Sequence, residues 1–341
     1  MDKDILLEIK GLKKYFPIRT GFWKRTSGYV KAVDDVDLFI RQGETLGLVG
    51  ESGCGKTTIG RCILKAINPT DGSIKYRNPD TQEMLELAQM KEKELWPLRR
   101  HLQMIFQDPY SSLDPRMPVL DIIGEPLLVN GLASGKKLAD KVSELMDMVG
   151  MDSRYMRRYP HAFSGGQRQR IGIARALATS PNFIVCDEAV SALDVSVRSQ
   201  ILNLLLDLQD RFNLSYLFIS HDLSVVRHVS HRVAVMYVGK LVESAQTEEI
   251  YAAPKHPYTE ALLSAIPVPD PRVKMERIIL PGEVANPARP PSGCYFHPRC
   301  MFKQDICVHE EPKLREVSPD HFVACHCADA ITLKGVKSIE C

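Results

Sequence analysis

The chain of 341 residues lacks any apolar run that approaches the roughly 18 residues needed for a membrane-spanning helix. Its N-terminus lacks a basic segment followed by an apolar core, so no secretory signal is expected. Basic and acidic residues nearly balance, at 44 against 42, and no basic run is interleaved with aromatic side chains. Nothing therefore suggests a nucleic-acid partner. With 44% hydrophobic residues, we expect a soluble globular protein with a sizeable core.

A glycine-rich stretch follows a short apolar run near residue 50. Residues 50–57 fit the pattern G-x-x-x-x-G-K-[ST], in which glycines let successive backbone N–H groups turn toward phosphate oxygens. The run at residues 46–49 predicts a buried strand, and a helix that starts beneath phosphates offers them its positive dipole end. We expect Lys56 to hold the β- and γ-phosphates and Thr57 to hold Mg²⁺. Apolar residues at helical spacing follow the loop: Ile59, Cys62, Ile63, Ala66 and Ile67. The predicted nucleotide-binding residues are Gly50, Glu51, Ser52, Gly53, Cys54, Gly55, Lys56, Thr57 and Thr58.

A second apolar run, at residues 183–186, ends in two carboxylates. Its short length and partly β-branched composition predict a buried parallel strand that delivers Asp187 and Glu188 at its C-terminal end. We expect Asp187 to hold Mg²⁺ through the hydration shell of the ion. We expect Glu188 to be the general base that polarises the water attacking the γ-phosphorus. A structural glutamate at this place would instead need a cationic partner.

The segment Ser164-Gly165-Gly166-Gln167 precedes a predicted helix from Arg168 to about Ala178. Its glycines leave backbone N–H groups free at the start of a helix, an arrangement that binds anions. Because the phosphate loop already serves the nucleotide of this chain, we expect the segment to bind the γ-phosphate held by a facing subunit. Ser-Gly-Gly alone is also common turn chemistry, but its place before the strand at residues 183–186 favours the anion site.

Together, these three stretches resemble the ATP-binding cassette ATPases of membrane transporters over roughly the first three-quarters of the chain. The resemblance implies roles for further residues. Gln107 resembles the Q-loop glutamine that contacts Mg²⁺ or the attacking water, and His221 resembles the switch histidine on the γ-phosphate. Ser191 and Asp194 resemble the D-loop that crosses the dimer interface. Phe16 falls where the family places an aromatic ring against adenine, with Tyr15 as second choice, although such a residue is as often part of the core.

Two positions depart from the commonest cassette pattern without removing a catalytic group. Phe163 stands where leucine usually opens the signature, and Ala189-Val190 replaces Pro-Thr after the catalytic glutamate. Both resemble the peptide-transport branch of the family, as do residues 107–115 and the segment His256-Pro257-Tyr258-Thr259. The resemblance therefore extends beyond the nucleotide-binding core.

The order of the motifs predicts an α/β fold, a P-loop NTPase (RecA-like) core with a parallel sheet. We expect a β-rich N-terminal subdomain and the first part of the core over residues 1–107, and the second part over 176–253. An inserted helical subdomain with the signature is expected over 108–175, and a small Cys/Pro-rich extension over 254–341. Residues 20–28, with Phe22 and Trp23, form an insertion expected as a surface hairpin or a partner contact. One amphipathic face in the helical subdomain contains Leu138, Val142, Leu145, Met146 and Val149.

The extension is rich in proline, so we expect few long regular elements, and five of the nine cysteines lie between Cys294 and Cys327. Thiolates in a small, loop-rich module suggest a metal centre, because a reducing cytoplasm disfavours disulfides. Their spacing matches neither a zinc ribbon nor a ferredoxin pattern, so the residues alone leave the metal open. The resemblance to peptide-permease ATPases implies a four-iron, four-sulfur (4Fe-4S) cluster. The alternatives are zinc, with His297 or His326 as added ligands, and reduced thiols without metal. The implied cluster ligands are Cys294, Cys300, Cys307 and Cys325.

The resemblance implies the ATP-hydrolysing subunit of a membrane importer of di- or oligopeptides, peripheral on the cytoplasmic face of the cell membrane. Implied partners are a second, homologous cassette ATPase in a heterodimer, two transmembrane permease subunits and an extracytoplasmic substrate-binding protein. Two cassettes would close on two ATP molecules, with each signature loop completing the site of the other subunit. Alternatives are another cargo, such as a nickel chelate or a sugar, and a soluble cassette ATPase of DNA repair or translation. The last class normally shows two cassettes, a coiled coil or a zinc hook.

Overall fold

The computed structural model describes residues 4–21, 25–267 and 277–336, and the chain divides into two compact units. The signature unit, named for the segment at Ser164, comprises Met1–Leu6, Ile40–Thr45 and Tyr76–Ile219. The phosphate-loop unit comprises Leu7–Phe39, Leu46–Lys75 and Ser220–Cys341. Each unit thus combines segments that are distant in the sequence.

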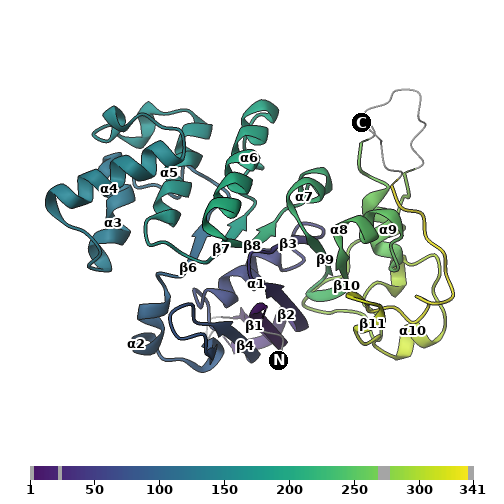
Figure 1. Ribbon diagram of the computed structural model, residues 1–341. Helices are drawn as coiled ribbons and strands as arrows, with labels where there is room; N and C mark the ends of the chain where they lie inside the picture. Colours follow the sequence, from purple (N-terminus) through teal and green to yellow (C-terminus); the bar gives the residue numbers. More distant parts are fainter. Residues whose placement is uncertain (1–3, 22–24, 268–276, 337–341) are drawn as a thin grey trace. The chain divides into compact units, whose positions relative to one another are not determined.

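Three parallel strands run through the signature unit in the order β8-β7-β6 (Figure 1). They are β6 (Leu102–Ile105), β7 (Phe183–Asp187) and β8 (Ser215–Ile219). The register pairs Ile105 with Cys186 and Asp187 with Ile219. Every residue of β7 and β8 is buried, which explains why both strands read as unbroken apolar runs. The predicted strand at residues 183–186 is confirmed, and Asp187 ends it.

Helices α3, α4 and α5 pack against one another in the same unit (Figure 1). The predicted apolar face is confirmed, since its five residues from Leu138 to Val149 are all buried. The helix after the signature begins at Gly165, earlier than predicted, because Ser164 caps it. The remaining elements of the unit are β5 (Met84–Glu86), α2 (Glu92–Leu95), α3 (Val119–Val129), α4 (Gly135–Met148), α5 (Gly165–Leu177) and α6 (Val195–Phe212).

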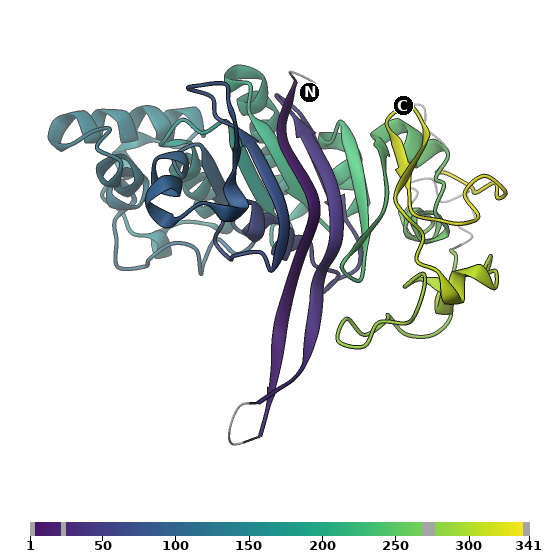
Figure 2. The same ribbon diagram turned by 90° about the horizontal axis from the view of Figure 1, so that it is seen from below.

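The phosphate-loop unit contains a long hairpin of β1 (Ile5–Thr20) and β2 (Arg25–Arg41), which Figure 2 shows as two adjacent extended strands. Strand β4 (Asp71–Arg77) lies on the other side of β1. These strands agree with the β-rich N-terminal subdomain expected from the sequence. The insertion at residues 20–28 is only partly described, so its expected role as a surface hairpin or a partner contact stays a prediction. Phe22 and Trp23 lie outside the described residues.

A second sheet of this unit runs in the order β11-β12-β10-β9-β3. Strand β3 (Thr45–Val49) is parallel to β9 (Arg232–Tyr237), whereas β9 is antiparallel to β10 (Lys240–Gln246). The short strands β11 (Arg315–Ser318) and β12 (His321–Val323) come from the C-terminal extension. Because β12 pairs with β10, the extension is held partly by the sheet, in addition to anything its cysteines contribute.

The helix after the phosphate loop is shorter than the sequence pattern predicted. Helix α1 (Lys56–Ile63) buries Ile59, Cys62 and Ile63, as expected. Lys65 then adopts a left-handed backbone with φ of 51°, which ends the helical run. The prediction that Ala66 and Ile67 continue the helix face is therefore wrong.

Only short helices occur in the described part of the chain after residue 220, and within the extension from residue 254 this agrees with its proline content. They are α7 (Leu223–Val229), α8 (Thr247–Ala252), α9 (Pro257–Leu263) and α10 (Ile306–His309). A 3₁₀ turn spans His297–Arg299. Asp222 caps α7, and His256 caps α9 by accepting the backbone N–H of Tyr258 at 3.1 Å.

A buried carboxylate, Glu243 on β10, anchors the start of the extension. It accepts backbone N–H groups of Lys255 at 2.6 Å and His256 at 3.0 Å, and it lies 2.8 Å from Nε2 of His321. These contacts satisfy a charge that is fully withdrawn from solvent. Burial lowers the pKa of His256 to about 4, and the charge of Glu243 opposes this shift only in part.

This shift predicts acid sensitivity of the fold. The unfolded chain binds a proton at His256 near pH 6.5, whereas the folded chain does not until about pH 4. The contribution of neutral His256 to the free energy of unfolding is therefore fully present above pH 6.5. It falls by roughly 3 kcal/mol as the pH drops toward 4, at about 1.36 kcal/mol per pH unit. Asparagine at this position keeps a capping acceptor without titrating. We expect the unfolding free energy of His256→Asn, from urea denaturation at several pH values, to fall less than that of the wild type. An equal loss of unfolding free energy with falling pH in the variant and the wild type would contradict the prediction.

Candidate functional site

The phosphate loop has a backbone conformation that only glycine accommodates at two positions. Gly50 has φ of 147° and Gly55 has φ of 109°. A Cβ atom on Gly50 would lie 2.1 Å from the carbonyl oxygen of Met236, and one on Gly55 would lie 2.0 Å from that of Ala32. The loop therefore lies directly against β2 and the end of β9, with its backbone unobstructed by side chains at these points. Such a cradle fits the phosphates of a nucleotide.

Lys56, the first residue of α1, places its charge within this loop. Its Nζ donates to the carbonyl oxygens of Gly50 at 2.7 Å and Glu51 at 3.0 Å, and the side chain is buried. The ammonium group and the positive end of the α1 dipole thus coincide. Thr57 and Thr58 follow, half-buried, in the first turn of α1. This arrangement has the charge and the donors that a triphosphate needs.

The two candidate adenine platforms have different surroundings on β1. The Tyr15 hydroxyl donates to Asp34, and the Nζ of Lys31 lies 5.7 Å from the Tyr15 ring centroid. Burial, helped by Asp34, raises the pKa of Tyr15 above its ordinary value. Phe16 is 39% exposed, with the Nζ of Lys14 at 5.0 Å from its ring centroid. Both residues remain predictions as platforms.

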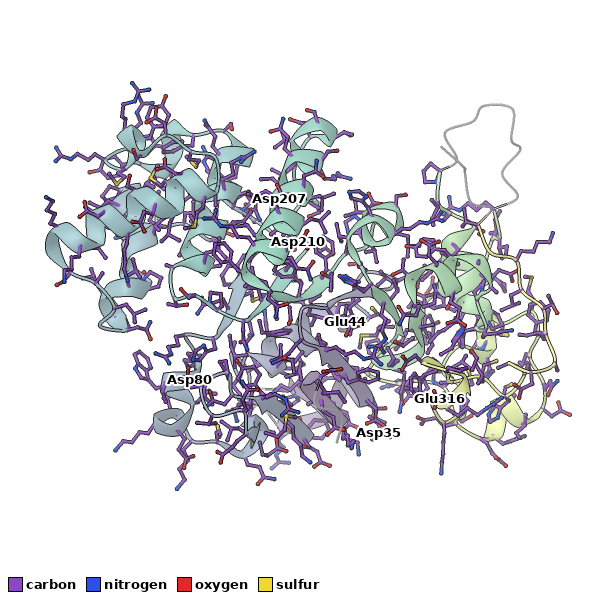
Figure 3. All side chains as sticks on the ribbon, viewed as in Figure 1. Asp35, Glu44, Asp80, Asp207, Asp210 and Glu316 are labelled. Carbon is purple, nitrogen blue, oxygen red and sulfur yellow. The ribbon has the colours of Figure 1, made fainter. Side chains whose placement is uncertain are left out.

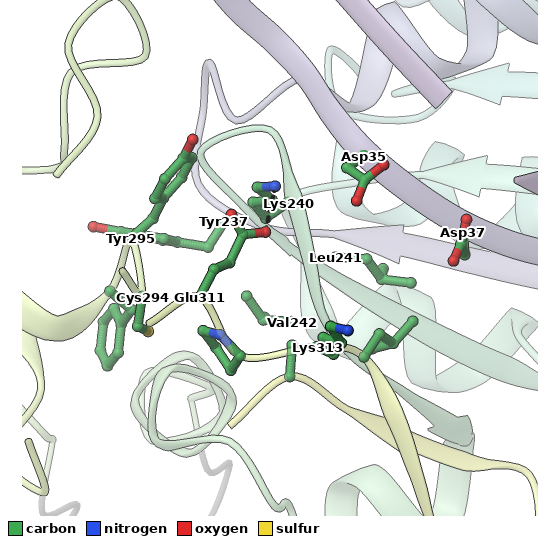
Figure 4. A pocket seen from close by; sticks show the side chains of 14 residues that line it. Asp35, Asp37, Tyr237, Lys240, Leu241, Val242, Cys294, Tyr295, Glu311 and Lys313 are labelled. Atoms are coloured by element: carbon green, nitrogen blue, oxygen red, sulfur yellow. Dashed lines mark hydrogen bonds and ion pairs between the residues drawn. The ribbon is translucent and has the colours of Figure 1, made fainter. Parts of the chain in front are cut away.

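A cavity of about 270 Å³ lies in the same unit between β2, β10 and the extension (Figure 4). Lys240 pairs with Glu311 at 2.5 Å within it, and Asp35 and Asp37 contribute further carboxylates. The Tyr295 hydroxyl, from the same lining, donates to Asp34 at 2.7 Å. Among the predicted site residues only Cys294 lines this cavity, so it is separate from the phosphate loop.

In the signature unit, two of the predicted catalytic residues, Gln107 and Glu188, come together at the end of β7. Gln107 Nε2 donates to Glu188 Oε2 at 2.8 Å, and Asp187 is buried beside it in sequence. The backbone N–H of Glu188 donates to the carbonyl oxygen of Ile219 at 3.0 Å. The Ser191 hydroxyl donates to the carbonyl oxygen of Glu188 at 2.9 Å. The glutamine, the glutamate and the start of the D-loop therefore form one hydrogen-bonded group, suited to orienting a water.

The signature segment forms a reciprocal cap at the start of α5. Ser164 Oγ accepts the N–H of Gln167 at 3.3 Å, and Gln167 Oε1 accepts the N–H of Ser164 at 3.0 Å. Both side chains are exposed. A Cβ on Gly166 would lie 2.4 Å from Cγ1 of Val197, so the helix start packs too closely on α6 for a side chain there. The exposed cap suits an anion that arrives from outside the chain.

Two further predicted residues are exposed at the ends of elements. Asp194 is the residue before α6, and His221 precedes α7 in the phosphate-loop unit. The preceding residue, Ser220, is hydrogen-bonded to β3, because its backbone N–H donates to the carbonyl oxygen of Leu48 at 3.2 Å. His221 is thus attached to the strand that leads into the phosphate loop.

The four cysteines predicted as metal ligands come together in the C-terminal extension. Cys294, Cys300, Cys307 and Cys325 line one cavity of about 10 Å³, together with Cys327, which the sequence analysis did not include. Within residues 4–21, 25–267 and 277–336, no group of three or more His, Cys, Asp or Glu side chains is arranged to hold a metal ion. Burial raises the pKa of Cys294 to about 11 and that of Cys325 to about 12, which favours protonated thiols.

The extension contacts the phosphate loop, which sequence reasoning missed. The backbone N–H of Glu51 donates to the Tyr258 hydroxyl at 3.0 Å. Nη1 of Arg299 lies 3.0 and 3.2 Å from the two carboxylate oxygens of Glu51. Burial lowers the pKa of Arg299, but its interactions with Glu51 and Tyr237 outweigh that effect and raise it overall. The sequence assigns this segment only candidate metal ligands, Cys300 and His297, and the charge of Arg299 between them was the available signal.

A glycine cradle with a lysine, a glutamine–glutamate pair after a buried strand and an exposed helix cap define an ATP-binding cassette. A family model described as ABC transporter matches residues 33–191, and one described as oligopeptide/dipeptide transporter, C-terminal region, matches residues 242–307. The oligopeptide transport ATP-binding protein AppF of Bacillus subtilis (strain 168) is 51% identical over 327 residues, covering 95% of this chain and 98% of AppF. The putative oligopeptide transport ATP-binding protein YkfD of the same strain is 51% identical over 324 residues, covering 94% of this chain and 95% of YkfD. The chain therefore belongs to the ABC transporter family, as one of its ATPases.

Solved structures agree with this fold. The dimeric post-hydrolysis structure of the ATP-binding cassette MJ0796, bound to ADP and Pi, superposes with a TM-score of 0.62 at 27% identity. It covers 71% of this chain and 99% of the MJ0796 chain. The predicted P-loop NTPase core is thereby confirmed. In the part of the chain that the structure describes, no helix has the length and apolarity to cross a membrane.

Replacing Glu188, the expected general base, should separate nucleotide binding from hydrolysis. We expect Glu188→Gln to lower ATP turnover on the order of 100-fold or more, because the amide cannot accept the proton of the attacking water. Affinity for ATP should persist, since Lys56 and the glycine cradle are unchanged. Asp207→Asn, at an exposed site on α6 that Figure 3 labels, is the matched control and should keep full turnover. Near-normal turnover of Glu188→Gln would remove the residue from its catalytic role.

Proposed function

We propose that this chain is the ATP-hydrolysing subunit of a membrane importer for di- or oligopeptides. The observation that carries the proposal is the similarity to AppF over nearly the whole length of both chains, because it includes the C-terminal region as well as the cassette. A soluble cassette ATPase would share the nucleotide site but has no need of an extension typical of oligopeptide transporters.

Each catalytic side chain has a role that its surroundings support. The loop N–H groups and Lys56 bind the phosphates, and Thr57 and Asp187 hold Mg²⁺, which when bound neutralises charge on the transferring phosphoryl group. Gln107 orients the water, and Glu188, held by that same glutamine, accepts its proton. His221 would contact the γ-phosphate, and Phe16 or Tyr15 would stack on adenine.

The signature segment acts on the nucleotide of a second cassette. Support comes from the exposed cap at Ser164 and Gln167 and from the dimeric state of MJ0796, a related cassette. We propose a heterodimer with a homologous ATPase, with Ser191 and Asp194 in the interface. Two permease subunits and an extracytoplasmic substrate-binding protein complete the importer. The chain is then peripheral on the cytoplasmic face of the cell membrane.

Purification from native membranes tests this assembly. We expect the tagged chain to bring down two polytopic membrane proteins and a second cassette ATPase, because transport requires all four. The Glu188→Gln variant should recover the same partners while peptide uptake by the cells is lost. A soluble complex without membrane subunits would overturn the transporter proposal. If cells with the Glu188→Gln variant assemble the complex and still take up peptides, but fail to take up nickel or a sugar, then only the proposed cargo is wrong.

We also keep a 4Fe-4S centre on Cys294, Cys300, Cys307 and Cys325 as a proposal. Its support is the convergence of their side chains on one cavity. Anaerobic purification should then yield about four iron atoms per chain with visible absorbance, and Cys300→Ser should lose both. Cys62→Ser, at a buried site on α1, is the control and should keep the iron. Zinc or no metal in the anaerobic protein would contradict the iron centre.

A further inference from the structure

The phosphate loop carries a negative charge of its own. Glu51 is the one acidic residue among residues 50–58, and it directly follows Gly50. Its backbone is an integral part of the cradle, because its carbonyl oxygen accepts Lys56 Nζ at 3.0 Å. A carboxylate at this place repels the polyanion that the loop binds, unless a cation compensates it.

Arg299 supplies that cation from the extension. Its Nη1 contacts both Glu51 carboxylate oxygens, at 3.0 and 3.2 Å, and the two side chains are only 10% and 27% exposed. Limited exposure keeps water and salt from screening the pair as they screen ion pairs at the surface. Lys56 contacts the carbonyl oxygen of Glu51 rather than its carboxylate, so its charge is directed to the loop backbone.

A rigid aromatic cluster positions Arg299. The 3₁₀ turn His297–Arg299 contains Pro298, and the N–H of Arg299 donates to the carbonyl oxygen of Phe296 at 3.0 Å. The Phe296 ring is buried and packs on Tyr237 and Tyr258, at centroid distances of 5.3 and 5.4 Å. Tyr258 also accepts the N–H of Glu51. One cluster therefore holds the backbone of Glu51 through Tyr258 and directs Arg299 to its carboxylate.

We propose that Arg299 is a positioning residue for nucleotide binding, which neutralises the Glu51 carboxylate so that the phosphate loop can accept ATP. The C-terminal extension is then part of the nucleotide site in its electrostatics, although it touches the loop and not the phosphates. Tyr258 fixes the shape of the loop, and Arg299 fixes its charge. The inference concerns ATP binding alone, so it stands or falls independently of the peptide cargo.

Calorimetric titration of the full chain with MgATP tests the charge role. We expect Arg299→Gln to raise the Kd for ATP about tenfold at roughly 50 mM salt. The rise should be smaller at roughly 500 mM, because without the arginine the Glu51 carboxylate is open to solvent and salt screens its repulsion of ATP. Arg299→Lys keeps the positive charge and should recover most of the affinity. Arg289→Gln removes an exposed arginine of the same extension and should leave the Kd unchanged. Thermal unfolding of each variant identifies any that is misfolded.

A double-variant comparison separates charge from shape. In a Glu51→Gln background the loop has no carboxylate to compensate, so adding Arg299→Gln should cause no further loss of ATP affinity. If Arg299 serves only to hold the loop in place, its removal should weaken binding similarly in both backgrounds and at both salt concentrations. That result, or normal ATP affinity of Arg299→Gln alone, would overturn the proposal.

Discussion

An anion can be held by backbone N–H groups only where no side chain stands between them and the ligand, and this steric condition governs both helix starts that matter in the chain. At α1 it requires left-handed glycines at Gly50 and Gly55, each pressed against a carbonyl oxygen of a neighbouring strand. At α5 it requires Gly166 against Val197. The strands fix where these helices begin, and the buried strand β7 places the proposed catalytic carboxylates at its C-terminal end.

Features that depend on a few consecutive residues could be predicted from the sequence. The buried strands β3 and β7 and the amphipathic face of α4 follow from local pattern. The helix after the signature was also predicted, but it begins earlier than expected because Ser164 caps it. The end of α1 could not be predicted in this way. Ala66 and Ile67 keep helical spacing in the sequence, but the left-handed backbone of Lys65 ends the helix, and no residue type there announces such a turn.

Features that depend on distant segments were beyond the reach of the pattern. The Glu51–Arg299 pair spans 248 positions, and the pairing of β12 with β10 joins two short strands that carry little signal of their own. Cys327 lines the same cavity as the four cysteines that the resemblance implied as ligands. In each case tertiary packing decides which residues meet. The pattern of charge and hydrophobicity along the sequence does not contain this information.

At Glu188, the backbone conformation that the fold requires is unfavourable for the residue type that the expected activity requires. Its φ of 47° is left-handed, a conformation that is unfavourable for a residue with a long side chain and easy for glycine or asparagine. Exchange for either should strengthen the fold while it removes the carboxylate that Gln107 holds. Selection for a more stable chain and selection for a working one therefore act in opposite directions here, and a search for stabilising substitutions would favour an inactive protein.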